Sequence, residues 1–91
     1  MKIKQSKPIT EIKKGDKIKV NKKEFNVDGH YVMIDHGDTK EMVIELFDPK
    51  AKENEGDYQL RYFNDNSDGN ISFYQLKEII YEKIDLESLE W

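Results

Sequence analysis

Short runs in which apolar and polar side chains alternate are the dominant pattern along this chain. Lys17–Val20 alternates with a period of two, and Glu24–Val27 repeats the alternation after the polar connection Asn21–Lys23. A period of two is typical of a strand that buries one face. We therefore predict that residues 16–27 form a β-hairpin, because two alternating runs flank a short polar connection.

The second strand is expected to continue beyond Gly29 into His30–Ile34, where apolar or aromatic side chains occupy both faces. Glycine lets a strand bulge or bend, so we predict a bulge or bend at Gly29. Alternating or apolar runs predict a third strand over residues 42–47, which ends before Pro49, and a fourth strand over residues 58–63.

A capping signal predicts a helix near the C-terminus. Ser72 is followed three residues later by Gln75, which is the spacing of a capping box. The apolar side chains that follow fall on one stripe at helical spacing, and they are Phe73, Leu76, Ile79, Ile80 and Ile84. We predict an amphipathic helix from Ser72 through Ile84 that packs on one face of the sheet.

These elements predict one domain over residues 1–91, of the mainly β (α+β) class. The expected fold is a small curved antiparallel sheet or an SH3-like barrel of about four to five strands, with one C-terminal amphipathic helix. Residues 1–8 are interpreted as a lead segment whose flexibility is left open. Residues 49–57, which carry Ala51 as their only apolar side chain besides a proline, are interpreted as a mobile loop.

The run Ile12–Val20, followed by Phe25 and Val27, resembles the first strands of SH3-like barrels, including the KOW-type domains of ribosomal and transcription proteins. The resemblance is confined to this segment. It implies a strongly curved small barrel that presents loops and one open edge, and proteins of that kind mostly act as binding modules. Strands two and three are apolar on both faces, so either barrel closure or a homodimer must cover the second face. We favour closure and a monomer, because Gly29 supplies the bend.

The amino-acid composition excludes several classes of protein. The chain of 91 residues is 36% hydrophobic and 37% charged, and it contains no Cys. Thiolate metal sites, thiol enzymes and disulfide-stapled secreted folds are therefore excluded. The first residues lack the apolar run of a signal peptide, and no stretch reaches the ~20 apolar residues of a membrane span. We expect a cytoplasmic protein that has no membrane partner.

Charge divides the chain into a basic and an acidic part. Residues 1–24 carry nine Lys against three acidic side chains, whereas residues 25–91 carry six basic against sixteen acidic side chains. Nucleic-acid binding usually requires a basic surplus over the whole domain. A local Lys-rich edge remains an alternative, and its candidate residues are Lys13, Lys14, Lys17, Lys19, Lys22, Lys23 and Arg61, the last of which is flanked by aromatic side chains.

The segment 64–75 resembles an EF-hand calcium loop. Its candidate ligands are Asn64, Asn66, Asp68, Ser72 and Gln75. Asn64 stands where an Asp is usual, and Gln75 stands where a bidentate Glu closes the site, so Asp68 is the only carboxylate in a standard ligand position. We expect a capped connection that binds calcium weakly or not at all.

The two histidines do not indicate an active site. His30 and His36 lie about 20 Å apart on an extended strand, so they cannot share a metal unless the chain folds between them. We therefore expect no catalytic residue, no metal and no cofactor. The favoured function is a non-enzymatic binding or adaptor domain with a protein partner, and the alternative is a nucleic-acid or ribosome-associated module. Trp91 either folds back on the core or projects towards a partner.

Overall fold

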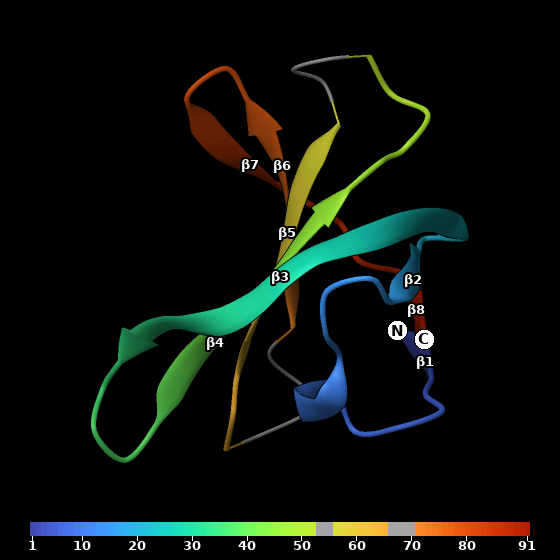
Figure 1. The fold of residues 1–91 in the computed structure, drawn as a ribbon. Coiled ribbons are helices and arrows are strands. Elements are labelled where there is room, and N and C mark those ends of the chain that lie inside the picture. Colours follow the sequence, from blue (N-terminus) through green and yellow to red (C-terminus); the bar gives the residue numbers. More distant parts are fainter. Residues whose placement is uncertain (53–55, 66–70) are drawn as a thin grey trace.

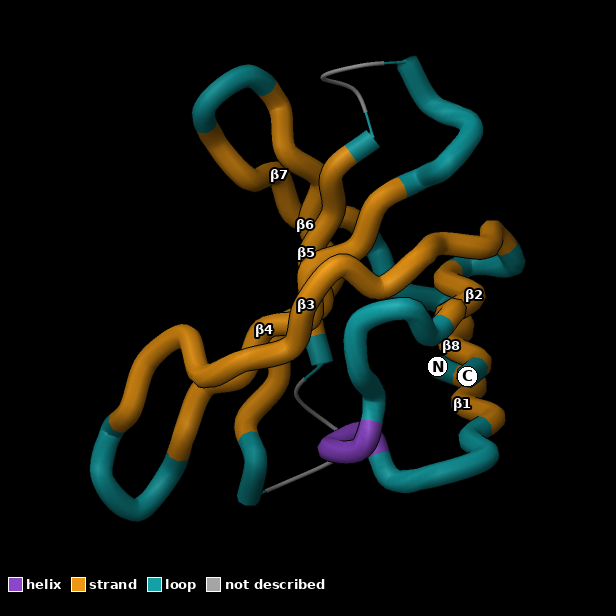
Figure 2. Tube along the Cα trace, in the orientation of Figure 1, coloured by secondary structure: helices purple, strands orange, loops and turns teal. Residues whose placement is uncertain are grey.

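The computed structural model describes residues 1–52, 56–65 and 71–91, and these residues build one eight-stranded sheet (Figure 1). The strands are β1 (Lys2–Lys4), β2 (Lys17–Val20), β3 (Lys23–Asp35), β4 (Lys40–Phe47), β5 (Asp57–Phe63), β6 (Ser72–Lys77), β7 (Ile80–Ile84) and β8 (Ser88–Glu90). A 3-10 turn, η1 (Ile9–Glu11), lies in the connection between β1 and β2 (Figure 2).

The strand order is β1-β8-β2-β3-β4-β5-β6-β7. Strands β2 to β7 form an antiparallel meander, β8 pairs antiparallel with β2, and β1 pairs parallel with β8. The expectation of a mainly β fold is confirmed. The sheet is curved and open, with β1 and β7 as its edges in the part of the chain described, so barrel closure and the expected strand number were wrong.

The short connection between β7 and β8 requires the sheet to curl. In a flat sheet, β7 and β8 would be separated by six strand spacings, or about 29 Å. The chain from Ile84 to Ser88 spans at most about 14 Å when fully extended. The sheet therefore coils until β7 approaches the start of β8. The N- and C-terminal residues lie side by side because β1 pairs with β8 (Figure 1).

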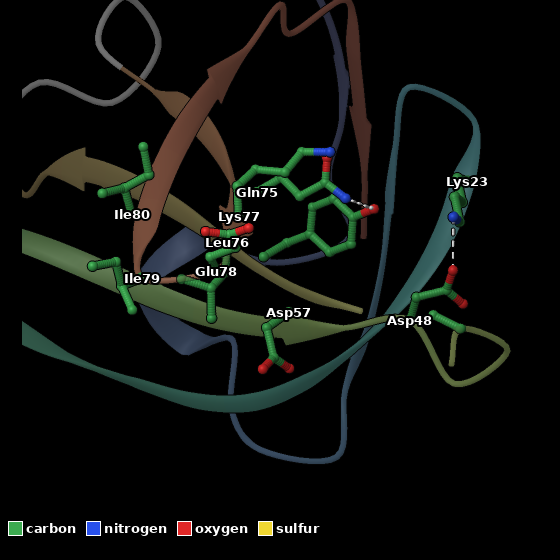
Figure 3. Close-up of a pocket in the computed structure, with 11 residues that line it drawn as sticks. Lys23, Asp48, Asp57, Gln75, Leu76, Lys77, Glu78, Ile79 and Ile80 are labelled. Atoms are coloured by element: carbon green, nitrogen blue, oxygen red, sulfur yellow. Dashed lines mark hydrogen bonds and ion pairs between the residues drawn. The ribbon is translucent and has the colours of Figure 1, made fainter. Parts of the chain in front are cut away.

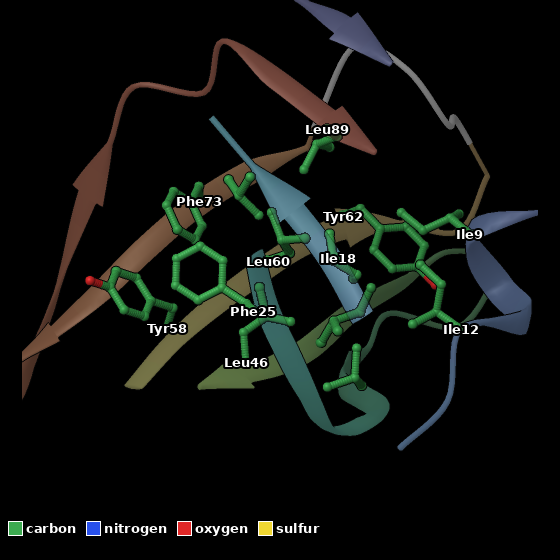
Figure 4. Close-up of a cluster of buried hydrophobic side chains, with 13 residues drawn as sticks. Ile9, Ile12, Ile18, Phe25, Leu46, Tyr58, Leu60, Tyr62, Phe73 and Leu89 are labelled. Atoms are coloured by element: carbon green, nitrogen blue, oxygen red, sulfur yellow. The ribbon is translucent and has the colours of Figure 1, made fainter. Parts of the chain in front are cut away.

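The concave face of the curled sheet holds the hydrophobic core (Figure 4). Alternate residues of β2 to β6 point into it, and Ile9 and Ile12 from the segment around η1 close one end. Three aromatic rings meet at the other end: Phe25 lies 4.7 Å from Tyr58 and 5.8 Å from Phe73, measured between ring centroids. A period of two thus directs alternate residues of β2 to β5 into the core, as the sequence pattern predicts.

The prediction of a bulge at Gly29 is confirmed. The β3–β4 register shifts between Val27 and Gly29, and a second shift follows between Val32 and Ile34. A Cβ added at Gly29 would lie 3.2 Å from Cε1 of Tyr31, which is a close contact. Because Gly29 has no side chain, the Tyr31 ring can lie over the bulge.

The predicted helix over Ser72–Ile84 was wrong. Among the described residues this stretch forms the hairpin β6–β7, joined by the two-residue turn Glu78–Ile79. The residues that resemble a helical stripe divide between the two faces and the turn, and only Phe73 among them is fully buried. Ser72 and Gln75 are strand residues, so the capping box does not form. Strand pairing with β5 outweighs the local capping signal.

Both ends of the chain are tied to the sheet. The lead segment contains β1, and the Trp91 amide donates to the carbonyl of Lys4 at 3.0 Å. The indole Nε1 of Trp91 donates to the carbonyl of Lys7 at 2.8 Å, and its side chain packs against the core. Trp91 therefore folds back on its own chain. Residues 1–52, 56–65 and 71–91 include no helix long and apolar enough to cross a membrane.

The loop expected over residues 49–57 ends one residue earlier, because Asp57 begins β5. The Asp48 amide donates to the carbonyl of Gly56 at 2.8 Å, and this bond closes the base of the connection. Ala51 also donates to the carbonyl of Asp48 at 3.2 Å, which forms a turn after Asp48. Residues 53–55 lie outside the described residues.

Candidate partner-binding groove

An open groove of about 1040 Å³ lies between the turn end of the β6–β7 hairpin and the two ends of the β4–β5 connection (Figure 3). Its floor is Tyr58, which is 9% exposed and stacks on Phe73 with 5.3 Å between ring centroids. The Tyr58 hydroxyl accepts a hydrogen bond of 3.1 Å from Nε2 of Gln75. The remaining walls come from the hairpin and from the two ends of the β4–β5 connection, and they include Asp57, Leu76, Lys77 and Ala51.

An ion pair forms the far rim of the groove. Nζ of Lys23 lies 2.6 Å from Oδ2 of Asp48, whose side chain is only 7% exposed. The hydrogen bond from Lys23 lowers the pKa of Asp48, and the same bond raises the pKa of Lys23. A second bond, from the Lys50 amide to Oδ1 of Asp48 at 2.9 Å, holds the carboxylate in place. The rim is therefore a fixed charged pair.

The tip of the hairpin exposes two large apolar side chains beside the groove. Ile79 is 92% exposed and Ile80 is 63% exposed. The turn that presents them has Glu78 at a φ of +57°, a region that costs a residue other than glycine free energy. Backbone strain of this kind is over-represented at functional positions. The sequence pattern placed both isoleucines on a buried helical stripe, so their exposure was not foreseen.

Only part of the candidate lysine set gathers on one surface. Lys19 and Lys22 line a hollow of about 320 Å³ together with Lys2 and Lys4. Lys2 and Lys4 reach this surface because β1 pairs with β8, which lies beside β2. Lys2 and Lys4 alternate with Ile3, but three residues are too few for a clear periodic signal. Glu90 pairs in register with both Lys4 and Lys19, so this basic patch contains a carboxylate at its centre.

The other lysines of the set lie elsewhere or have partners. Nζ of Lys17 lies 3.6 Å from a carboxylate oxygen of Glu24, and Lys23 is paired with Asp48. Lys13 and Lys14 are exposed in the loop before β2. The structure therefore does not bring the six candidate lysines together.

Arg61 lies three strands from β2 in the sheet order, on the convex face. Its guanidinium carbon is 4.2 Å from the centroid of the Tyr74 ring and 5.4 Å from that of Tyr81. Nε of Arg61 donates to Oε1 of Gln59 at 2.9 Å. These contacts engage Arg61 within its own sheet, so it does not join the lysines.

A carboxylate completes this network on the convex face. Oε1 of Glu45 accepts from the Tyr31 hydroxyl at 2.7 Å and from Nε2 of Gln59 at 2.7 Å. The bond to Glu45 raises the pKa of Tyr31 to about 12, so the hydroxyl remains a donor at neutral pH. The network runs across β3, β4 and β5 and fixes the side chains that it contains.

His30 also serves the fold. Its Nδ1 lies 2.7 Å from the carbonyl oxygen of Ile12, and its Nε2 lies 2.7 Å from the hydroxyl of Tyr62. A carbonyl only accepts, so Nδ1 donates, and in the neutral ring Nε2 accepts from Tyr62. Burial raises the pKa of Tyr62 to about 12. His30 therefore ties the segment after η1 to β5, and both its nitrogens are occupied.

The segment that resembles a calcium loop is only partly described. Asn66 and Asp68 lie outside the described residues. Oδ1 of Asn64 accepts from the Lys40 amide at 2.9 Å, and Gln75 donates to Tyr58. The helix that would leave an EF-hand loop is replaced by β6. Asn64 and Gln75 thus have partners in the sheet, and the two-helix frame of an EF-hand is not formed by residues 56–65 and 71–91.

No three His, Asp or Glu side chains cluster as a metal site within the described part of the chain. The groove offers contact surface with a charged rim. No protein-family model, curated protein or solved structure matches the chain in sequence or fold.

Proposed function

We propose that the protein is a non-enzymatic binding or adaptor module whose partner is another protein. The observation that carries this proposal is the exposure of Ile79 (92%) and Ile80 (63%) beside the groove. Exposed apolar side chains grouped at one place, with polar residues around them, are typical of protein interaction sites. The resemblance of residues 12–27 to SH3-like barrels supports the same class of function, although a fold alone does not assign a ligand.

The neighbourhood of the tip supports a protein more than a nucleic acid. The groove is lined by Asp48, Asp57 and Glu78 as well as by Lys23 and Lys77, so its charges are mixed. A surface that binds nucleic acid mainly presents cations to phosphates. An apolar tip with a mixed charged rim instead resembles the core and rim of a protein interface.

A capture experiment tests this proposal. The tagged protein is incubated with extract of the source cell, in parallel with the variant Ile79→Asp, Ile80→Asp. The control variant Val32→Asp, Ile34→Asp changes two apolar side chains of the β3–β4 hairpin that are 45% and 46% exposed. We expect a protein retained by the wild type and the control variant and lost from the tip variant. Equal retention by all three would contradict a binding role for the tip.

The second candidate function is nucleic-acid or ribosome binding through Lys2, Lys4, Lys19 and Lys22. The observation that favours it is that β1, β2 and the β2–β3 turn bring these four side chains around one hollow. Such binding should weaken steeply with added salt, because phosphate neutralisation releases counterions. Filter binding of RNA and DNA at two salt concentrations tests this, and retention of neither nucleic acid would remove the candidate.

A further inference from the structure

The two edges of the sheet differ in length and in chemistry. The edge strand β1 has three residues, and its two end residues are exposed lysines. A short edge with lysines is a common protection against pairing with another strand. The other edge, β7, has five residues and begins with the exposed Ile80. Both edges carry charged side chains, and β7 is the longer of the two, so it offers more backbone to a further strand.

The register of the β6–β7 hairpin identifies which backbone groups are available. Residues that flank a two-residue turn form a hydrogen-bonded pair, and such pairs recur at every second position. The pair Lys77 and Ile80 flanks the turn, so Ile80, Glu82 and Ile84 direct their backbone groups to β6. Tyr81 and Lys83 direct their N–H and C=O groups away from the sheet. No loop or turn hydrogen bond from the described residues reaches the backbone of Ile80–Ile84.

The side chains of β7 define what an added strand should carry. Glu82 lies on the concave side with Ile80 and Ile84, because their register partners in β6 include the core residue Phe73. Lys83 lies on the convex side, where its register partner Tyr74 contacts Arg61. Opposite charges directly across an antiparallel pair are favourable, and like charges are unfavourable. An added strand should therefore place a cation opposite Glu82 and an anion opposite Lys83.

A second copy of β7 does not meet this requirement. When two copies of β7 pair antiparallel with full overlap, the two-fold axis passes between their central residues, so Glu82 of one copy faces Glu82 of the other. Like charges would oppose each other at the centre of the new pair. The charge pattern thus favours a different chain over self-association.

We propose that β7 binds an extended peptide segment of a partner protein as a ninth, antiparallel strand. The segment has apolar residues at its first and fifth positions, an acidic residue at the second and a basic residue at the third. The apolar positions lie next to Ile84 and Ile80, and the charged positions lie opposite Lys83 and Glu82. Main-chain bonds to Tyr81 and Lys83 supply affinity, and the charges supply specificity. This inference rests on the proposed binding function and assigns it a partner.

Two peptides of identical composition test the charge pattern. The first has the core Val-Glu-Lys-Thr-Val between Gly-Ser flanks, and the second exchanges the central pair to Val-Lys-Glu-Thr-Val. Fluorescence anisotropy with labelled peptides should show saturable binding of the first and about tenfold weaker binding of the second, because two attractive pairs become repulsive. The variant Glu82→Lys, Lys83→Glu should reverse the preference. Equal binding of both peptides, or no binding at millimolar peptide, would overturn the inference.

A proline substitution tests the backbone contribution. Lys83→Pro removes an N–H that points out of the sheet, a position at which an edge strand tolerates proline. It should abolish peptide binding, whereas Lys83→Ala, which keeps the N–H, should bind with only a modest loss. Thermal unfolding shows whether Lys83→Pro is folded. Amide hydrogen exchange of Tyr81 and Lys83 in the wild-type protein gives a second readout, because both N–H groups should become protected when peptide is added. Unchanged exchange would overturn strand addition.

The outcome for the edge can be separated from the outcome for the tip. A captured protein that is lost from the tip variant but retained by Lys83→Pro would overturn strand addition and leave the proposed function standing. Ile80 belongs to both surfaces, so the single variant Ile79→Asp, in the turn outside β7, separates them. Peptide binding that survives in Ile79→Asp, with no protein captured through the tip, would support the edge and contradict the groove as the partner site.

Discussion

Asn21 fastens the β2–β3 turn to the segment that leads into β8. Its Nδ2 donates to the carbonyl of Asp85 at 2.8 Å, and its Oδ1 accepts from the amides of Glu87 and Ser88 at 2.7 and 3.2 Å. Asn21 has a φ of +51° and Lys22 one of +69°, as in a type I′ turn. Asparagine tolerates this conformation better than most residues. Asn21 thus adopts the backbone conformation that the turn requires, and its side chain holds the segment before β8.

We expect Asn21→Ala to lower the free energy of unfolding by about 2–4 kcal/mol, because three hydrogen bonds are lost and alanine disfavours a positive φ. Asn21→Gly relieves the backbone but also loses the bonds, so its cost should be smaller. Urea denaturation of both variants measures the two contributions. An Asn21→Ala variant as stable as the wild type would show that these bonds do not hold β8 in place.

We expect the substitution Glu78→Gly to raise the stability of the protein. Its φ of +57° costs a side-chain-bearing residue about 1–2 kcal/mol, part of which Glu78→Gly should recover. The matched variant Glu82→Gly, in the strand itself, should instead lower stability. Thermal unfolding of the two variants distinguishes relief of strain from a general effect of glycine. A loss of stability in Glu78→Gly would contradict strain in this turn.

At the scale of elements, the meander from β2 to β5 follows from the sequence because its strands alternate clearly. The β6–β7 hairpin does not, because its turn Glu78–Ile79 contains no glycine or asparagine, which are the usual residues of two-residue turns. The apolar residues at helical spacing then imitate an amphipathic helix. The true alternation is visible only once Phe73 and Ile84 are known to face each other across the hairpin.

The strands β1 and β8 were missed for a different reason. Each has three residues, which is too short for a clear periodic signal. Their pairing joins opposite ends of the chain, so no local sequence pattern indicates it. The basic patch depends on this pairing, which explains why Lys19 and Lys22 were foreseen and Lys2 and Lys4 were not.

The bulge in β3 yields a prediction at this scale. Gly29→Val should lower the free energy of unfolding by about 1 kcal/mol or more, because the new side chain meets the Tyr31 ring at the bulge. If the ring is the cause, the cost should shrink in the Tyr31→Ala background, and a double-mutant cycle measures that coupling. An equal cost in both backgrounds would assign the effect to the backbone of the bulge instead.

At the scale of the whole molecule, the chain closes on itself through its ends and not through a closed ladder. Trp91 bonds to Lys4 and Lys7, and the Ser6 amide donates to the Trp91 carbonyl at 2.9 Å. Nζ of Lys7 in turn lies 2.6 Å from Oδ2 of Asp16, just before β2. These contacts fix the β1 side of the sheet, while β7 on the other side has only β6 as a neighbour in the sheet order. The two sides thereby acquire separate roles, one in closing the fold and the other in the proposed binding.

The ion pairs that hold this closed shape make stability depend on pH. Hydrogen bonds from Lys7 and Lys23 lower the pKa values of Asp16 and Asp48 from the ordinary value of 3.8. A carboxylate with a lowered pKa stabilises the fold above its ordinary pKa, and the contribution is lost as the pH falls through the lowered value. Asp48 raises the pKa of Lys23 above 10.5, so that contribution is present below pH 10.5 and is lost as the pH rises through the raised value.

We therefore expect the free energy of unfolding to be flat near neutral pH and to fall in acid and in strong base. Asp48→Asn keeps an oxygen for the Lys50 amide and removes the charge, so it should be less stable than the wild type at pH 7. The difference should vanish below the lowered pKa of Asp48, where the wild-type carboxyl is also neutral. Asp38→Asn, an exposed carboxylate in the β3–β4 turn, is the control and should follow the wild-type pH profile. Chemical denaturation from pH 2 to pH 8 measures the three profiles, and a constant difference between Asp48→Asn and the wild type would show that the lowered pKa of Asp48 does not contribute to stability.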